Sequence, residues 1–468
     1  MSHLYKLYTN KSCPFVHRAL IVIEEKKLAS AIEEVFIDLT DMPKWYAEIN
    51  PMETVPTLEV LHPSDAVKPH LNNGKYVYES QLIAEYLDSV SEPKEQLHGR
   101  NAKENHKVQF VSEASDLISA GYGLLRDPFN KEKRKAVEDN AAYLNRILEE
   151  GQTEEEGPFV CGSYFTLADI AITPFLIRFD ALLRYYAGVD VFYQAPALRR
   201  LFLAAKKRPS VVATSLTPAE YISIYANYLP ESHPWRGAVT GTEGIKPVLF
   251  YNPLSSFSDR VRLLLTTLPQ VKAHLVEVDY KEVGGWYAQV NYRQTVPALL
   301  SGGERPSAVH ESWPILLFLS QEYGQWAALS AEERYAMEFF NTKTQEFSTA
   351  MVRVLKQSNP SADDWEYFFW AAEEVVKELT ARNAGQPAHV FHGKAELNLA
   401  DFSFLPFLVR AHATLELLTE GKHDNIFEKF PILNQYLEKA LAKPEIKSVF
   451  LDPSKYLTRF KTLRSQSN

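Results

Sequence analysis

Apolar and polar positions near the start of the chain follow a regular alternation of strands and helices. Apolar positions 15, 19, 20, 22 and 23 have helical spacing, and Pro14 suits a first helical turn. The predicted strands cover 3–8, 32–37, 57–61 and 76–78, and the predicted helices cover 14–27 and 80–87. The predicted order β-α-β-α-β-β-α is followed by a purely helical pattern from about residue 95 to 228. We therefore expect a small α/β domain followed by a larger all-α domain.

The same pattern occurs a second time in the chain. Residues 7–18 (LYTNKSCPFVHR) align without a gap with residues 249–260 (LFYNPLSSFSDR). Further matches follow in the same order and extend over more than 150 residues. They pair Trp45-Tyr46-Ala47 with Trp286-Tyr287-Ala288, Thr54-Val55-Pro56 with Thr295-Val296-Pro297, Glu79-Ser80 with Glu311-Ser312, and Thr166-Leu167-Ala168-Asp169 with Asn398-Leu399-Ala400-Asp401. A repeat of this length indicates a duplicated unit of about 230 residues.

The duplication predicts five segments. Prolines and glycines cluster among polar residues between the two copies, which indicates a linker there. The predicted segments are an α/β domain at 1–90, a helical domain at 91–229, a linker at 230–246, a second α/β domain at 247–322 and a second helical domain at 323–468.

Composition narrows the classes of function. Of the 468 residues, 46% are hydrophobic and 23% are charged, which is typical of a globular protein. A net charge of −9 argues against nucleic acid or an anionic membrane as a partner. Two cysteines do not make a disulfide framework, and they form no metal-ligand cluster. Because the sequence shows no signal peptide and no long apolar run, we expect a cytoplasmic protein. Because it shows no cluster of metal-ligand residues, we expect no metal.

Cys13 is the first candidate for chemistry. It stands between a predicted strand and the helix that begins at Pro14, where unpaired backbone N–H groups and the helix dipole favour a thiolate. Lowering the thiol pKa from ~8.5 to ~6 would require about 3.4 kcal/mol. Val16 replaces the second cysteine of a dithiol motif, so an external thiol must resolve any mixed disulfide. This predicts a binding site for a small thiol beside Cys13.

Two further motifs suit such a site. Val55-Pro56 is a candidate cis peptide that would turn the Val55 backbone outward, where a peptide can pair with it. Glu79-Ser80 opens a helix whose first N–H groups and hydroxyl can hold a carboxylate, while Glu79 can accept from an ammonium group. Together these groups fit the α-amino-acid end of a γ-glutamyl peptide, although a helix cap alone would also explain the pair.

Other polar motifs are interpreted as structural. Thr166-x-x-Asp169 and Asn398-x-x-Asp401 match capping boxes at the start of buried helices. Cys161 lies in an apolar stretch just before the first of them, and we expect it to be a buried structural cysteine.

These residues together resemble the cytosolic glutathione transferases over nearly the whole chain, twice. The resemblance implies a thioredoxin-like domain followed by a helical domain in each copy. Cys13-Pro14-Phe15 with Arg18 is similar to the omega class, which acts in thiol transfer, deglutathionylation and dehydroascorbate reduction. The resemblance implies that Cys13 is the nucleophile. It also implies that the residues binding glutathione are Pro14, Phe15, Val55, Pro56, Glu79 and Ser80.

The doubled arrangement resembles the thiol-dependent reductases of trypanosomatid parasites. That implies trypanothione as an alternative reductant and a homo-oligomer, by resemblance a trimer. The chain departs from the omega pattern at Met42, where a lysine is usual, and at His17, where an acidic residue is usual. Lys44 is a candidate substitute for the missing lysine.

The second copy departs further. Ser255 occupies the position of Cys13, and residues 255–262 (SSFSDRVR) are similar to a zeta-class segment in which a serine donates to the glutathione thiolate. The residues of a second candidate glutathione site are Ser255, Val296, Pro297, Glu311 and Ser312. The alternative interpretation of this copy is a scaffold without activity.

Three functions remain open at this point. The leading one is a redox enzyme in which the Cys13 thiolate attacks mixed disulfides of small molecules or glutathionylated proteins. The second is a conjugating transferase, in which bound glutathione attacks an electrophile. The third is a non-enzymatic assembly module. Tyr122 and Arg126 lie on a predicted helix that could line the second substrate's pocket.

Overall fold

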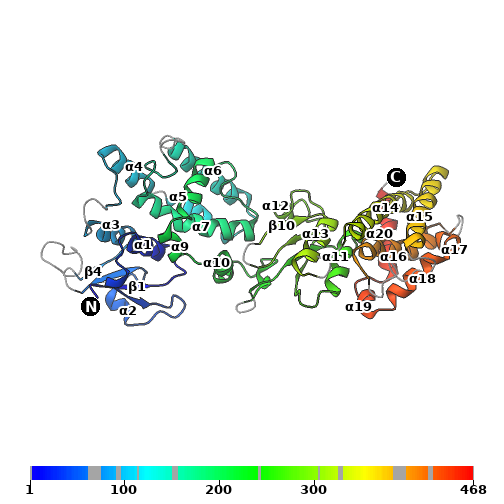
Figure 1. The fold of residues 1–468 in the computed structure, drawn as a ribbon, viewed down its shortest axis with the longest axis horizontal. Helices are drawn as coiled ribbons and strands as arrows, with labels where there is room; N and C mark the ends of the chain where they lie inside the picture. Colours follow the sequence, from blue (N-terminus) through cyan, green and yellow to red (C-terminus); the bar gives the residue numbers. More distant parts are fainter. Residues whose placement is uncertain are drawn as a thin grey trace. The chain divides into compact units, whose positions relative to one another are not determined.

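The fold is duplicated. In the computed structural model, the described residues are 3–61, 75–90, 96–112, 115–149, 157–240, 244–303, 306–324, 330–382, 397–419 and 425–466. The chain divides into two compact units, Met1–Ile245 and Lys246–Asn468. Each unit contains one four-stranded sheet and a set of helices (Figure 1). The predicted architecture of two α/β domains, each followed by helices, is confirmed.

The first unit begins with a mixed sheet in the order β2-β1-β3-β4. β1 runs parallel to β2 and antiparallel to β3, and β3 runs antiparallel to β4. The strands are β1 Tyr5–Thr9, β2 Ile32–Phe36, β3 Thr57–Val60 and β4 Tyr76–Val77. Parallel neighbours require a crossover, and helix α1 (Pro14–Glu25) supplies it between β1 and β2.

Helix α1 links the sheet to the helical part of the unit. It packs against α3 (Ser80–Ser89), α7 (Leu167–Ala187) and α9 (Pro209–Thr214). The apolar positions that predicted this helix are buried, from Ala19 to Ile23, with one exception. Phe15 is 41% exposed, although it belongs to the same apolar pattern. A short helix, α2 (Tyr46–Ile49), completes the α/β domain.

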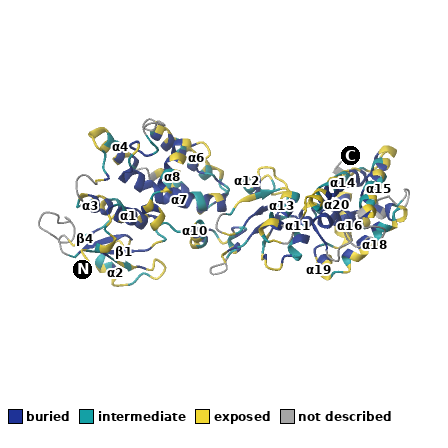
Figure 2. Cartoon of the chain, viewed as in Figure 1, coloured by how far each residue is buried: buried dark blue, intermediate teal, exposed yellow. Residues whose placement is uncertain are grey.

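The helical part of the first unit is built around α7 (Leu167–Ala187), which is buried along almost its whole length (Figure 2). The surrounding helices are α4 Ala102–Ser112, α5 Ser115–Leu125, α6 Lys131–Glu149, α8 Pro196–Ala205, α9 Pro209–Thr214 and α10 Pro218–Tyr225. α7 begins with the predicted capping box: the Asp169 carboxylate accepts from the backbone N–H and the hydroxyl of Thr166, both at 2.8 Å. The capping interaction fixes the start of a helix that carries residues of the candidate site.

The segment between the repeats is partly folded onto the first unit. Trp235 is fully buried, and Arg236–Ala238 form a short 3-10 helix. The strands β5 (Val239–Thr240) and β6 (Gly244–Ile245) pair with one another and contact α10. The boundary between the units therefore falls at the end of the predicted linker, and most of that segment is part of unit one.

The second unit repeats this plan. Its sheet has the order β10-β9-β7-β8, with strands β7 Val248–Tyr251, β8 His274–Glu277, β9 Ala298–Leu300 and β10 Ala308–His310. The helices of its α/β domain are α11 Ser256–Thr266, α12 Tyr287–Val290 and α13 Ser312–Glu322. Its helical part contains α14 Ala331–Lys356, α15 Ala362–Arg382, α16 Leu399–Thr419, α17 Ile426–Lys429, α18 Pro431–Leu441, α19 Pro444–Lys447 and α20 Pro453–Gln466.

Candidate functional site

Cys13 lies where the sequence predicts it, at the junction between β1 and α1. It is the N-cap residue of α1, in an extended backbone conformation. The turn before it is held by Asn10, whose side chain donates to Ile37 O at 2.9 Å and accepts from the Ser12 N–H at 3.0 Å. The Cys13 N–H donates to Asn10 O at 3.0 Å. The thiol is thus placed by backbone contacts that do not depend on its own side chain.

Val55 faces the thiol. The Val55–Pro56 peptide bond is cis, as predicted, and Cys13 Sγ lies 3.7 Å from Val55 O. The preceding Thr54 carbonyl accepts from Tyr46 Oη at 2.7 Å and from Asn50 Nδ2 at 2.9 Å. These contacts hold the loop in place, so the Val55 backbone is presented beside the sulfur.

The sequence predicted a lowered pKa for the Cys13 thiol, but in the structure this pKa is raised. Burial raises the pKa of Cys13 above its ordinary value of 9.0, and this is the largest influence. The backbone N–H groups of Val16 and Phe15 lower the pKa, as the sequence argument anticipates, and Arg178 and Arg18 do so as well. The expectation counted the helix N-terminus but not the protein packed around the sulfur, whose removal of water disfavours the charged form.

Glu79 and Ser80 begin α3, as predicted. Glu79 has a positive φ of 65°, and its side chain is exposed. Ser80 is buried, and its hydroxyl accepts from Arg18 Nη1 at 3.1 Å, while Arg18 Nε donates to Ala171 O at 2.8 Å. Arg18 therefore ties α1, α3 and α7 together directly behind the residues expected to hold a ligand. The Ser80 hydroxyl keeps its proton for donation to an anionic group.

Pro14 and Phe15 form one wall beside the sulfur. Phe15 packs edge-on against Phe175 of α7, with ring centroids 5.2 Å apart. The Arg18 guanidinium lies 4.9 Å from the Phe175 ring centroid. The exposed face of Phe15 therefore belongs to the site, which explains why this residue departs from the burial of its helix.

Cys13 opens into a largely apolar pocket of about 250 Å³. Tyr122 of α5 and Arg126, in the turn directly after α5, line it, as the sequence suggested for both residues. Tyr225, the last residue of α10, and Tyr228, in the short 3-10 helix that follows, line it as well. Tyr225 Oη donates to Ser12 O at 3.2 Å and lies 3.4 Å from Tyr122 Oη. Burial raises the pKa of both phenols, so they remain neutral at physiological pH. Sequence reasoning missed Tyr225 and Tyr228 because nothing in their spacing relates α10 to the start of α1.

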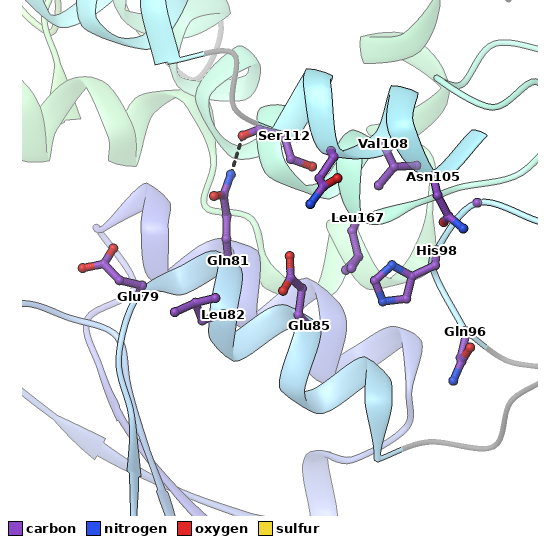
Figure 3. A pocket seen from close by; sticks show the side chains of 12 residues that line it. Glu79, Gln81, Leu82, Glu85, Gln96, His98, Asn105, Val108, Ser112 and Leu167 are labelled. Atoms are coloured by element: carbon purple, nitrogen blue, oxygen red, sulfur yellow. Dashed lines mark hydrogen bonds between the residues drawn. The ribbon is translucent and has the colours of Figure 1, made fainter. Parts of the chain in front are cut away.

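A larger cavity of about 750 Å³ lies beside α3 and α4 and does not contain Cys13 (Figure 3). Glu79 lies at one end of it, while Glu85 and His98 project into its other part (Figure 3). Gln81 is tied to the carbonyl of Ser112. This cavity lies between the start of α3 and the helical domain, whereas the Cys13 sulfur lies in the separate pocket of about 250 Å³.

The second unit reproduces the frame with different chemistry. Ser255 caps α11 by accepting from the Ser258 N–H at 3.2 Å. The Val296–Pro297 bond is cis, and Ser312 Oγ accepts from Arg260 Nη1 at 3.2 Å. Glu311 has a positive φ of 70°, like Glu79, but its carboxylate pairs with Arg293 at 2.9 Å. The five residues predicted for a second site therefore stand at equivalent places in the repeated fold, and the carboxylate of one of them, Glu311, is already paired.

Cys161 and metals complete the description. Cys161 is buried, and burial raises its pKa to about 11, in agreement with a structural cysteine. Within the described ranges, no three His, Cys, Asp or Glu side chains are grouped so that they could hold a metal ion. In the same part of the chain, no helix is both long enough and apolar enough to cross a membrane.

Comparisons with known proteins give the same division of the chain. Models of the glutathione S-transferase N-terminal domain match residues 12–90 and 249–327, and a model of the C-terminal domain of that family matches 106–214 and 335–449. Glutathione S-transferase L3 of Arabidopsis thaliana is 28% identical over 47% of this chain and 86% of its own length. Glutathione S-transferase omega-1 of Sus scrofa is 26% identical over 49% of this chain and 88% of its own length.

One solved structure matches both units. "Leishmania TDR1 - a unique trimeric glutathione transferase" is 37% identical, covers 98% of this chain and 100% of its own, and superposes with a TM-score of 0.84. The similarity therefore extends over both units of this chain and not only over one of them. With its two pairs of N- and C-terminal domains, this chain belongs to the glutathione S-transferase family.

Proposed function

We propose that this protein is a glutathione- or trypanothione-dependent thiol transferase and reductase in which Cys13 is the nucleophile. The observation that carries the proposal is the position of the Cys13 sulfur. It lies at the start of α1, 3.7 Å from Val55 O, and opens into a pocket of about 250 Å³. A sulfur in this position can meet a second sulfur held by the Val55 backbone.

The surrounding groups suit a γ-glutamyl thiol. The Val55 backbone is placed to pair with the cysteinyl part of glutathione, and the Ser80 hydroxyl and the α3 N–H groups suit the γ-glutamyl carboxylate. The Glu79 carboxylate, which has no ion-pair partner among the described residues, suits the ammonium group of the same end. Pro14 and Phe15 line the pocket beside the sulfur, and the cis bond to Pro56 presents the Val55 backbone there.

The reaction proceeds in two exchange steps. The Cys13 thiolate attacks the glutathione sulfur of a glutathionylated substrate, the substrate's S–S bond breaks, and the substrate leaves as a thiolate that takes a proton from water. A second glutathione thiolate then attacks the glutathione sulfur of the Cys13 mixed disulfide. Glutathione disulfide forms, and Cys13 is released as a thiolate. With trypanothione, its two thiols act in turn, so that free glutathione and trypanothione disulfide are the products.

Dehydroascorbate is a substrate of the same nucleophile in this proposal. Two thiols become one disulfide, and the two electrons and two protons pass to dehydroascorbate, which becomes ascorbate. The mainly apolar pocket with Tyr122, Tyr225 and Arg126 is the region where such a second substrate would lie. The physiological partners are therefore small thiols and disulfides and glutathionylated proteins.

The assembly and location are also proposals. The similar Leishmania protein is named as a trimeric transferase, and we extend a trimer to this chain. We propose a cytoplasmic location, where a reduced thiol pool keeps Cys13 available. Size-exclusion chromatography with light scattering tests the trimer, and a mass of one or two chains would contradict it.

The test compares Cys13→Ser with Cys161→Ser as the matched control. We expect Cys13→Ser to lose at least about 10³-fold of glutathione-dependent turnover with a mixed disulfide and with dehydroascorbate. It should also lose the one-glutathione adduct seen by intact mass, while Cys161→Ser keeps both. Full turnover and adduct in Cys13→Ser would exclude the proposal. Conjugation of an aryl halide that survives in Cys13→Ser and is lost in Ser255→Ala would favour a conjugating transferase in the second unit.

A further inference from the structure

Arg178 is a fully buried arginine of α7 that lies behind the loop carrying Cys13. Its Nη2 donates to Ser12 O at 3.0 Å, and its Nη1 donates to Pro174 O at 2.9 Å. The guanidinium carbon lies 4.4 Å from the Tyr221 ring centroid. No carboxylate among the residues that the structure describes lies within ion-pair distance of Arg178. A buried guanidinium without a counter-charge is uncommon, because burying an unpaired charge is unfavourable.

The polar neighbour of Arg178 is a neutral histidine. His17 Nδ1 lies 3.2 Å from Arg178 Nη1, and His17 Nε2 lies 3.0 Å from Thr214 Oγ1. The Thr214 hydroxyl donates to Ser210 O at 2.7 Å, so it accepts from His17 Nε2–H. His17 Nδ1 is then the acceptor for Arg178. Burial and the Arg178 charge lower the pKa of His17 to about 3, so the ring carries no charge at neutral pH.

The second unit contains the same arrangement with the charge neutralised. Arg410 donates to Pro406 O at 2.9 Å and lies 4.4 Å from the Tyr456 ring, which matches Arg178. However, Asp259 stands in the position of His17 and binds Arg410 at 2.8 Å. Asp259 also binds Arg262, which is partly exposed and has the apolar Leu20 as its counterpart in the first unit.

The difference coincides with the difference in nucleophile. The unit with the unpaired arginine carries the thiol at Cys13, and the unit with the paired arginine carries the hydroxyl of Ser255, which does not ionise in this range. We propose that Arg178 is a positioning residue that orients the Ser12–Cys13 loop and directs its unpaired charge toward the Cys13 thiolate, and that neutral His17 keeps this charge available. The proposal rests on the role of Cys13 proposed above.

The groups that face Cys13 from each neighbouring element support this assignment. Arg18 of α1 and Arg178 of α7 favour the thiolate, and Arg178 has the larger effect of the two on the pKa of Cys13. Tyr122 of α5 and Tyr225 of α10 are neutral phenols, and the Arg126 side chain, directly after α5, lines the same pocket as Cys13. Glu79, the N-cap residue of α3, is an acidic group that raises the pKa of Arg18. Arg18 has an equivalent in Arg260, and Arg178 has one in Arg410, so the neutral neighbour of Arg178 is what distinguishes the first unit.

The experiment follows Cys13 alkylation by iodoacetamide against pH in the full chain carrying Cys161→Ser. The variant His17→Asp copies the aspartate of the second unit. We expect it to raise the midpoint pH of the alkylation profile of Cys13 by about one unit and to slow alkylation below that pH about three- to tenfold. The neutral variant His17→Gln should stay within about twofold of the parent. Arg178→Met should change the rate in the same direction as His17→Asp, and it provides the test if His17→Asp does not fold.

Circular dichroism and thermal melting establish that each variant is folded. Equal pH profiles in the parent and in folded His17→Asp would overturn the proposal, as would an equal slowing in His17→Gln. Alkylation needs no glutathione, so the two proposals can fail separately. A protein that lacks thiol transferase turnover can still show the His17 effect, and a normal Cys13-dependent turnover with no His17 effect rejects only the inference about Arg178.

Discussion

The start of α1 in the first unit and the start of α11 in the second share one frame. In both, an asparagine holds the turn before the helix: Asn10 donates to Ile37 O at 2.9 Å, and Asn252 donates to Val278 O at 2.8 Å. In both, a buried arginine bridges three helices: Arg18 reaches Ala171 O at 2.8 Å, and Arg260 reaches Ser403 O at 2.9 Å. Groups that are identical in two divergent copies are those the fold needs to join sheet and helices.

The differences between the units lie at the chemical groups. The thiol of Cys13 is replaced by the Ser255 hydroxyl, which accepts from the backbone of its own helix. Glu79 has no ion-pair partner among the described residues, whereas Glu311 is paired with Arg293 at 2.9 Å. The second unit therefore keeps the frame of a glutathione site while its charged groups bind one another. From this contrast we infer that the first unit is the catalytic one.

The largest expected difference is in stability. Asp259→Asn removes the carboxylate that binds Arg410 and Arg262, both at 2.8 Å, and leaves a buried guanidinium unpaired. We expect it to destabilise the second unit by about 3–5 kcal/mol. His17→Gln exchanges one neutral partner of Arg178 for another and should change stability by about 1 kcal/mol or less. Calorimetry that resolves the unfolding of the two units measures both changes in stability. Equal losses of stability in the two variants would contradict the proposed difference between the paired and the unpaired arginine.

The next prediction concerns pH. Because burial raises the pKa of Cys13 above 9.0, the thiol is mostly protonated at neutral pH, and its thiolate fraction grows about tenfold for each pH unit. Alkylation of Cys13 in the free protein should therefore rise about a hundredfold from pH 7 to pH 9 without a plateau. Cys161, whose pKa is raised to about 11, should remain unreacted over this range. A plateau below pH 7 would show that the helix N-terminus outweighs burial after all.

A smaller effect is expected at the two acidic residues before α3 and α13. Glu79→Gln removes a charge proposed to hold the ammonium group of glutathione, and we expect the KM for glutathione to rise about tenfold with kcat changed less than about twofold. Glu311→Gln is the matched control and should leave both constants unchanged. A loss of kcat without a change in KM in Glu79→Gln would indicate that Glu79 acts on the thiol through Arg18 instead.

Sequence reasoning located the frame because its signals are local. Strand and helix periodicity, the Pro14 helix start, the repeated Val-Pro pairs and the Thr166–Asp169 cap each lie within a short segment. Each was confirmed, including the cis bonds at Val55–Pro56 and Val296–Pro297. The duplication added information, since a motif that occurs twice in register is more than a chance pattern.

The features that sequence reasoning missed depend on distant segments. Tyr225 lies 213 residues from Ser12, to which it donates, and Arg178 lies 161 residues from His17. No periodicity relates such pairs, and the same packing determines the burial that raises the Cys13 pKa. One signal was available without a structure: His17 aligns with Asp259 and Arg178 with Arg410, so the repeat retains the arginine while a histidine stands in one copy where the other has an aspartate.

The smallest expected effect comes from exchanging Met52 and Arg293. These residues occupy equivalent places, since the Met52 N–H donates to Asn50 Oδ1 at 3.0 Å and the Arg293 N–H donates to Asn291 Oδ1 at 3.1 Å. The Arg293–Glu311 pair is half exposed, so breaking it releases at most about 1 kcal/mol, or about fivefold in affinity.

Arg293→Met should therefore create or strengthen weak glutathione binding in the second unit by up to about fivefold. The reciprocal Met52→Arg should pair with Glu79 and weaken binding in the first unit by a similar factor. Isothermal titration calorimetry with Cys13→Ser in both cases counts the sites without turnover. If Arg293→Met adds no glutathione binding to the second unit while Met52→Arg weakens binding in the first, a free Glu311 carboxylate is not sufficient for a site in the second unit. If neither variant changes binding, Glu79 and Glu311 do not contact the ligand, and the contrast between the units reduces to Cys13 and the arginine behind it.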